Sequence, residues 1–92
     1  MKKTSFMMIF SSLIGISEMD EEWQARVKAI LKAELKRKGV GYRELAARLT
    51  AQGEPESERN IANKISRGGF SAAFFAQCLS VIGCTTIRLD DA

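Results

Sequence analysis

The stretch YRELAARLTAQGEPESERNIANKISRG, residues 42–68, decides the fold that we expect: two short helices joined by a loop. The first helix begins at Tyr42 and has apolar side chains at helical spacing. Its expected core residues are Leu45, Ala46 and Leu49. The segment Thr50–Glu56 contains Gly53 and the only proline, Pro55, which together indicate a loop.

The second helix of this stretch is expected from Ser57 to Arg67. Serine is a preferred N-cap residue, and the glycines at 68 and 69 favour a helix end. At about 100° per residue, one side of this helix carries apolar residues. These are Ile61, Ala62 and Ile65.

The opposite side of helix 57–67 is polar and carries no acidic residue. It consists of Arg59, Asn60, Asn63, Lys64, Ser66 and Arg67. Arginine can make a bidentate contact with guanine and asparagine with adenine, whereas lysine and serine readily contact phosphate oxygens. This surface therefore predicts a nucleic-acid interface, and the alternative interpretation is an ordinary solvated helix face.

Two further helices are expected on either side of this stretch. One runs from Asp20 to about Lys38, with acidic residues at its start and basic residues at its end, as the helix dipole favours. Its apolar positions are Trp23, Val27, Ile30, Leu31 and Leu35. Trp23 either anchors this helix in the core or lies in a dimer interface. The other helix is capped by Ser71 and ends at Gly83. Its apolar stripe is Phe74, Phe75, Cys78, Leu79 and Ile82.

The C-terminal residues 85–89 alternate between polar and apolar and include β-branched side chains. This pattern is typical of a short strand or an extended tail. Because no second strand is evident, such a strand would have to pair with another copy or pack flat on the helices. The expected fold class is therefore all-α, with four to five helices and a short C-terminal strand or extended tail.

The order of these elements resembles the helix-turn-helix of lambda-repressor-like proteins over roughly residues 23–83. The segment Tyr42–Leu49 resembles the second helix of that family, and Asn60–Gly68 resembles the recognition helix and its closing glycine. The resemblance implies duplex DNA as the partner. It also implies phosphate contacts from Tyr42 and Arg43, at the start of the helix that crosses the DNA backbone.

More narrowly, residues 20–89 resemble a family of short bacterial proteins of unknown function. The matching motifs are Tyr-x-Glu-Leu-Ala-x-x-Leu and Glu-Arg-Asn-x-x-Asn-Lys-Ile-Ser-Arg-Gly-x-Phe-Ser-x-x-Phe. That resemblance implies no activity. The sequence also departs from ordinary repressor-like domains, because the segment between Leu49 and the third helix is several residues longer than their tight turn.

Composition bounds the class of protein. The 92 residues are 46% hydrophobic and 27% charged, which is typical of one globular domain. A chain of this length buries a limited core, so a homodimer or a complex with a protein partner is among the expected arrangements. The net charge of +3 suits an anionic partner.

Enzyme chemistry is not expected. The chain has two cysteines and no histidine, and it lacks metal-ligand spacing and a phosphate-binding glycine loop. We therefore expect no catalytic residues, no metal and no cofactor. The two cysteines, Cys78 and Cys84, are interpreted as buried thiols of a reducing cytoplasm.

Residues 1–18 are treated as an N-terminal extension that precedes the helix-turn-helix-like domain of residues 19–92. Lys2 and Lys3 precede an apolar run, which leaves three interpretations open: a start of translation at Met19, a signal-like segment, or a segment that docks on a partner or on the core. The run is shorter than the roughly 20 residues of a membrane span, so no membrane association is expected.

These observations favour a small bacterial transcriptional regulator that is cytoplasmic and reads double-stranded DNA with helix 57–67. The alternative is a protein-interaction adaptor that uses helix 71–83 and the C-terminal strand.

Overall fold

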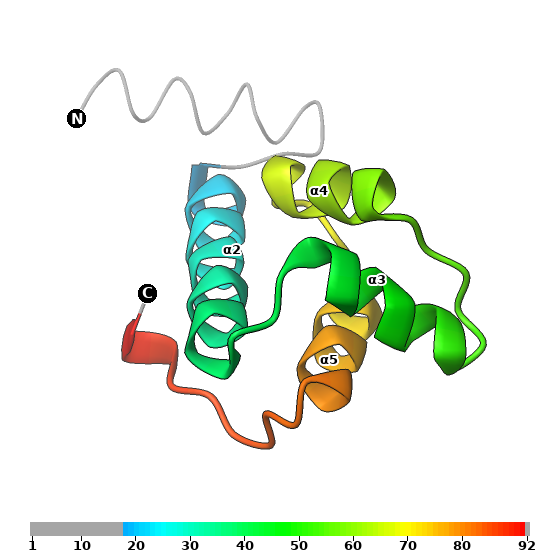
Figure 1. Ribbon diagram of the computed structural model, residues 1–92. Helices are drawn as coiled ribbons and strands as arrows, with labels where there is room; N and C mark the ends of the chain where they lie inside the picture. Colours follow the sequence, from blue (N-terminus) through cyan, green and yellow to red (C-terminus); the bar gives the residue numbers. More distant parts are fainter. Residues whose placement is uncertain (1–17, 92) are drawn as a thin grey trace, which may run out of the picture.

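The computed structural model describes residues 18–91, so the three interpretations of the N-terminal extension lie outside the described residues. The described part is all-α, as expected (Figure 1). Its elements are α2 (Glu18–Lys38), α3 (Tyr42–Ala51), α4 (Glu58–Arg67), α5 (Ala72–Val81) and a 3-10 turn, η1 (Leu89–Asp91).

Helix starts and ends follow local capping chemistry. The Ser57 Oγ accepts the Asn60 N–H at 3.1 Å, and the Ser71 Oγ accepts the Phe74 N–H at 3.0 Å. Both serines therefore cap their helices as expected. Each of the four α-helices is followed by a glycine with positive φ, which is the backbone conformation that ends a helix without a Cβ clash.

One continuous core joins the four helices. Helix α3 contacts α4 and α5, and α2 contacts α5. The fully or almost fully buried side chains of the core include Leu31, Leu45, Leu49, Ile61, Ile65 and Cys78. At about 1.5–3 kcal/mol for each large apolar side chain, this burial is the main favourable contribution to folding.

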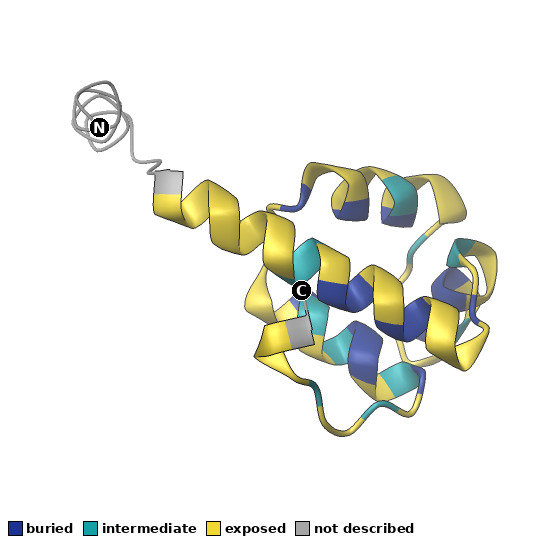
Figure 2. Ribbon diagram, turned by 90° about the vertical axis from the view of Figure 1, so that its left-hand side faces the viewer, coloured by how far each residue is buried: buried dark blue, intermediate teal, exposed yellow. Residues whose placement is uncertain are grey.

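The N-terminal half of α2 takes no part in this core. Every residue from 19 to 26 is exposed, and these turns project from the body of the domain (Figure 2). Trp23 remains 41% exposed. It therefore does not anchor α2 in the core of its own subunit.

Of the short strand or extended tail expected at residues 85–89, the strand is not present. Residues 84–88 have no regular structure, and the chain then forms η1, which lies against α2 (Figure 1). No strand occurs elsewhere in residues 18–91. An isolated strand would leave its backbone groups without a ladder, so local alternation alone does not produce one.

Gly68 offers a test of this helix architecture. Its φ is +76°, and a Cβ at this position would meet the Gln24 carbonyl oxygen at 3.5 Å. We expect Gly68→Ala to lower the free energy of unfolding in urea by about 1–2 kcal/mol, because alanine is strained in the left-handed region. The control is Gly69→Ala, whose Cβ would meet only the Gln24 side chain, at 3.8 Å. Equal losses of unfolding free energy for Gly68→Ala and Gly69→Ala would contradict a left-handed backbone conformation at Gly68.

Candidate nucleic-acid interface

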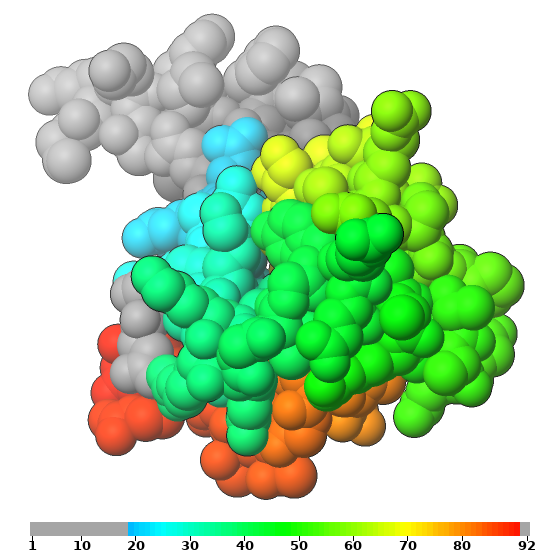
Figure 3. Space-filling view, viewed as in Figure 1, coloured from blue at the N-terminus to red at the C-terminus, as the bar shows by residue number. Residues whose placement is uncertain are grey.

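Helix α4 is oriented by its two buried isoleucines. Ile61 is 0% exposed and Ile65 is 1% exposed, and both belong to the core cluster. Because they lie on one side of a ten-residue helix, they determine which side faces solvent. In the space-filling view α4 lies along the edge of the described part (Figure 3).

The side of α4 opposite the isoleucines carries Arg59, Asn63 and Arg67. These positions are four residues apart, so their side chains follow one line along the helix. All three residues are exposed, as are the neighbouring Asn60 and Ser66. We call these five residues the outward face. Within residues 18–91, neither Arg59 nor Arg67 forms an ion pair.

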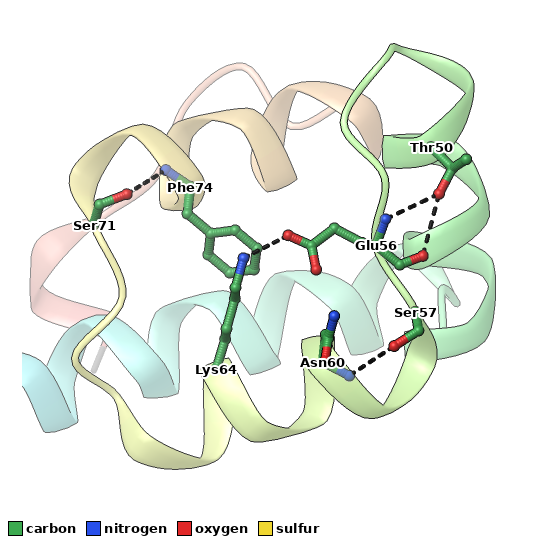
Figure 4. Close-up of polar contacts among 7 residues, drawn as sticks. All are labelled: Thr50, Glu56, Ser57, Asn60, Lys64, Ser71 and Phe74. Carbon is green, nitrogen blue, oxygen red and sulfur yellow. Dashed lines mark hydrogen bonds and ion pairs between the residues drawn. The ribbon is translucent and has the colours of Figure 1, made fainter.

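Lys64, which the sequence also assigned to the interface, is placed differently. Its Nζ forms an ion pair with the Glu56 Oε2 at 2.5 Å and lies 4.8 Å from the centre of the Phe74 ring (Figure 4). The Glu56 side chain is only 9% exposed. The ammonium group of Lys64 is therefore directed to the flank of α4 that faces the preceding loop and α5, away from the outward face.

The loop between α3 and α4 is held by a small set of hydrogen bonds. The Thr50 Oγ1 accepts the Glu56 N–H and donates to the Glu56 carbonyl oxygen, both at 3.2 Å (Figure 4). The Glu54 N–H donates to the Leu49 carbonyl oxygen at 3.0 Å, which closes the end of α3. These bonds keep the lengthened loop folded, and Glu56 then fastens it to α4.

The start of α3 holds the other two predicted contacts. Arg43 is exposed, whereas Tyr42 is half-buried and packs against the core. Gly41, the N-cap, has no side chain to accept the first N–H groups of α3. Among residues 18–91, no hydrogen bond or ion pair joins Tyr42 or Arg43 to the outward face.

Sequence reasoning did not identify the residues that position α4. Thr50, Glu56 and Phe74 act across a loop, and no helical or strand periodicity relates them to Lys64. A further such contact comes from α2, where the Lys28 Nζ donates to the Ser66 carbonyl oxygen at 3.1 Å. The Lys28 ammonium group supplies a hydrogen bond to a carbonyl group near the C-terminal end of α4. Its positive charge also interacts favourably with the negative end of the helix dipole.

The two cysteines differ in burial: Cys78 lies in the core, whereas Cys84 is only partly buried at the start of the C-terminal segment. Burial, reinforced by the charge of Glu56, raises the pKa of Cys78 to about 12, against a smaller opposite effect of Lys64. Burial also raises the pKa of Cys84, whose thiol donates to the Glu34 Oε1 at 3.5 Å. Both thiols are therefore poor nucleophiles at neutral pH.

No group of three or more histidine, cysteine, aspartate or glutamate side chains lies close enough to hold a metal ion within residues 18–91. Among the same residues, no helix combines the length and apolar character needed to cross a bilayer.

The fold and the surface define a small all-α domain with a cationic face on α4. A family model described as a domain of unknown function (DUF6471) matches residues 23–87, so the chain belongs to that family. These limits agree with the resemblance to uncharacterised short proteins over residues 20–89. No curated protein and no solved structure matches the chain.

The ion pair of Glu56 and Lys64 is expected to stabilise the fold. Because the carboxylate is largely buried, we expect Glu56→Ala and Lys64→Ala each to lower the free energy of unfolding by about 1–2 kcal/mol, with a coupling of about 1 kcal/mol in the double-mutant cycle. The matched control is the pair of Arg88 and Asp90, whose side chains are 72% and 70% exposed. Its coupling should be close to zero, because solvent screens an ion pair between exposed side chains. Equal coupling in the two cycles would show that Glu56 has no special role.

Proposed function

We propose that this protein binds duplex DNA through the outward face of α4 and acts as a small transcriptional regulator. One observation carries the proposal: Arg59, Asn63 and Arg67 stand together in solvent, opposite the buried Ile61 and Ile65. Their side chains are available to a polyanion without the loss of an ion pair within the described residues.

The dimensions of α4 suit a major groove. A helix with its side chains is about 10–12 Å in diameter, and the major groove of B-DNA is about 12 Å wide, so the groove admits one helix. The two arginines and Asn63 supply the groups that read guanine and adenine, and Ser66 can contact phosphate. In this arrangement α3 and α4 serve as the two helices of a repressor-like helix-turn-helix, and Arg43 at the start of α3 contacts the backbone.

The lengthened loop is compatible with this mode of binding. Glu56 projects toward Lys64 on the flank of α4, so its charge is neutralised by a cation and removed from the outward face. Glu58 follows the N-cap and lies about 100° around the helix from Arg59, on the side away from Asn63. Neither acid therefore lies on the line of side chains that would enter the groove.

Salt dependence of duplex binding tests the proposal. Affinity of the full chain for a fluorescent random-sequence duplex should fall linearly with salt on logarithmic axes, because each neutralised phosphate contributes a slope of about −0.9. Arg59→Ala and Arg67→Ala should each weaken binding. A variant that has lost a phosphate contact should also have a slope shallower by about 0.9.

Two controls remove the same charge elsewhere. Lys36→Ala lies near the C-terminal end of α2, at the opposite end of the domain from α4 (Figure 1). Lys64→Ala removes a cation that is paired with Glu56. Both should leave the slope within about 0.3 of the unmodified chain, well below the change for one phosphate contact. The proposal fails if no duplex is bound, or if all four variants weaken binding equally.

A second candidate function is supported by a different surface. A groove of about 380 Å³ lies between α5 and the C-terminal segment, with Leu79 and Ile87 in its lining. Leu89 nearby is 57% exposed. Such a groove suits an apolar segment of a protein partner, which would make the chain an adaptor.

Matched variants separate the two functions in cells that express the full chain. If the adaptor function holds, Leu89→Ser and Ile87→Ser should abolish crosslinking to a defined partner identified by mass spectrometry, whereas Arg59→Ala and Asn63→Ala should not change it. If the DNA-binding function holds, Leu89→Ser should leave duplex affinity unchanged within about two-fold, since surface substitutions away from a site have small effects.

A further inference from the structure

The first turns of α2 carry an apolar stripe that lies outside the buried core of the described part, where the guanidinium group of Arg26 lies over the Trp23 ring, 4.9 Å from its centre. Met19, Trp23 and Val27 follow one another at intervals of four residues, and the same side of the helix becomes buried from Ile30 onward. Met19 is 61% exposed and Trp23 is 41% exposed. The stripe is thus a continuation of the core side of α2 beyond the body of its own domain (Figure 2).

A groove runs beside this stripe. It has a volume of about 310 Å³ and lies between α2 and the turn that joins α4 to α5. Its apolar lining comprises Trp23, Val27, Phe70, Ala72 and Phe75. Phe70 and Phe75 stack at 6.1 Å between ring centres, so one wall of the groove is aromatic. The aromatic and aliphatic side chains of this lining suit the contact of an indole ring.

The charges that flank the stripe identify the occupant. Glu22 and Arg26 lie on the same flank of Trp23, one helical turn apart, with Glu22 Oε2 and Arg26 Nη2 separated by 3.9 Å. Consider a second α2 that lies antiparallel to the first, with the two-fold axis at the level of residue 24 along the helix. Glu22 of each copy then comes next to Arg26 of the other. The surface is therefore complementary to itself, which is the condition for a two-fold symmetric dimer.

We propose that this face binds a second copy of the chain, with the two α2 helices antiparallel and each Trp23 seated in the groove of the other copy. Two ion pairs between copies, from Glu22 to Arg26, then flank a central aromatic cluster. Removal of Trp23 and Met19 from water supplies the apolar contribution, and aromatic anchors in a pocket are typical of the residues that dominate an interface.

The dimer stands independently of the proposed DNA binding, and it has a consequence for it. Gly68 lines the same groove, so the C-terminal end of each α4 lies close to the two-fold axis. If the proposed function holds, the pair would present two copies of the outward face related by the same axis, and an inverted repeat would be the expected binding site.

Charge exchange tests the interface without relying on loss of folding. The molar mass of the full chain, measured in the absence of nucleic acid by sedimentation or light scattering, should be that of a dimer. Glu22→Arg and Arg26→Glu should each raise the dissociation constant about ten-fold or more, because each places like charges opposite each other. An equimolar mixture of the two variants should restore a dimer. The two arginines at positions 22 and 26 of one variant then face the two glutamates at the same positions of the other.

Three further measurements complete this test. Trp23→Ala should also yield monomers, and Glu21→Arg, on the side of α2 away from the stripe, should remain dimeric. The only tryptophan, Trp23, should show blue-shifted fluorescence in the dimer. A monomer at every accessible concentration would overturn the proposal, whether Trp23 is solvated or is shielded by residues of its own chain. Dimers that persist in both single charge variants would also overturn it.

Discussion

Burial of Ile61 and Ile65 sets the rotation of α4 about its own axis, and the candidate surface depends on this constraint. Neither isoleucine can be exposed without a loss of several kcal/mol, because each fills a close-packed site against α3 and the rest of the core. Because that side of the helix is buried, the opposite side, with Arg59, Asn63 and Arg67, faces solvent. Polar side chains at helical spacing form a solvent-facing surface only because the isoleucines on the opposite side of the helix are buried.

The loop before α4 contributes to the same constraint from the flank. Thr50 holds the backbone of Glu56, and Glu56 in turn holds Lys64 beside Phe74. Lys28 contacts the Ser66 carbonyl oxygen near the other end of the helix. The cations around α4 therefore divide into two groups: Lys28 and Lys64 are engaged within the fold, whereas Arg59 and Arg67 are available to a partner.

Local chemistry accounts for what could be predicted from the sequence. The two serine caps and the closing glycines act within four or five residues, so the helix limits could be read from the chain, and the isoleucine spacing gave the buried side of α4. The partner of Lys64 could not be predicted, because Glu56 reaches it across a loop. Residues 85–89 were expected to form a strand or an extended tail, and sequence could not decide between the two, because a strand requires a neighbour and alternation says nothing about one. The exposure of Trp23 could not be predicted either, because it depends on the point at which α2 extends beyond the other helices.

The most direct test of the central claim is to map the contact surface by nuclear magnetic resonance, adding an excess of random-sequence duplex DNA to the isotope-labelled full chain at low salt. The account predicts that the largest shift changes fall on the backbone amides of α4 and on the side-chain groups of Arg59, Asn63 and Arg67. Lys64 Nζ and the residues of α5 should change little. Shift changes confined to α5 and residues 84–91, or none at all, would contradict it.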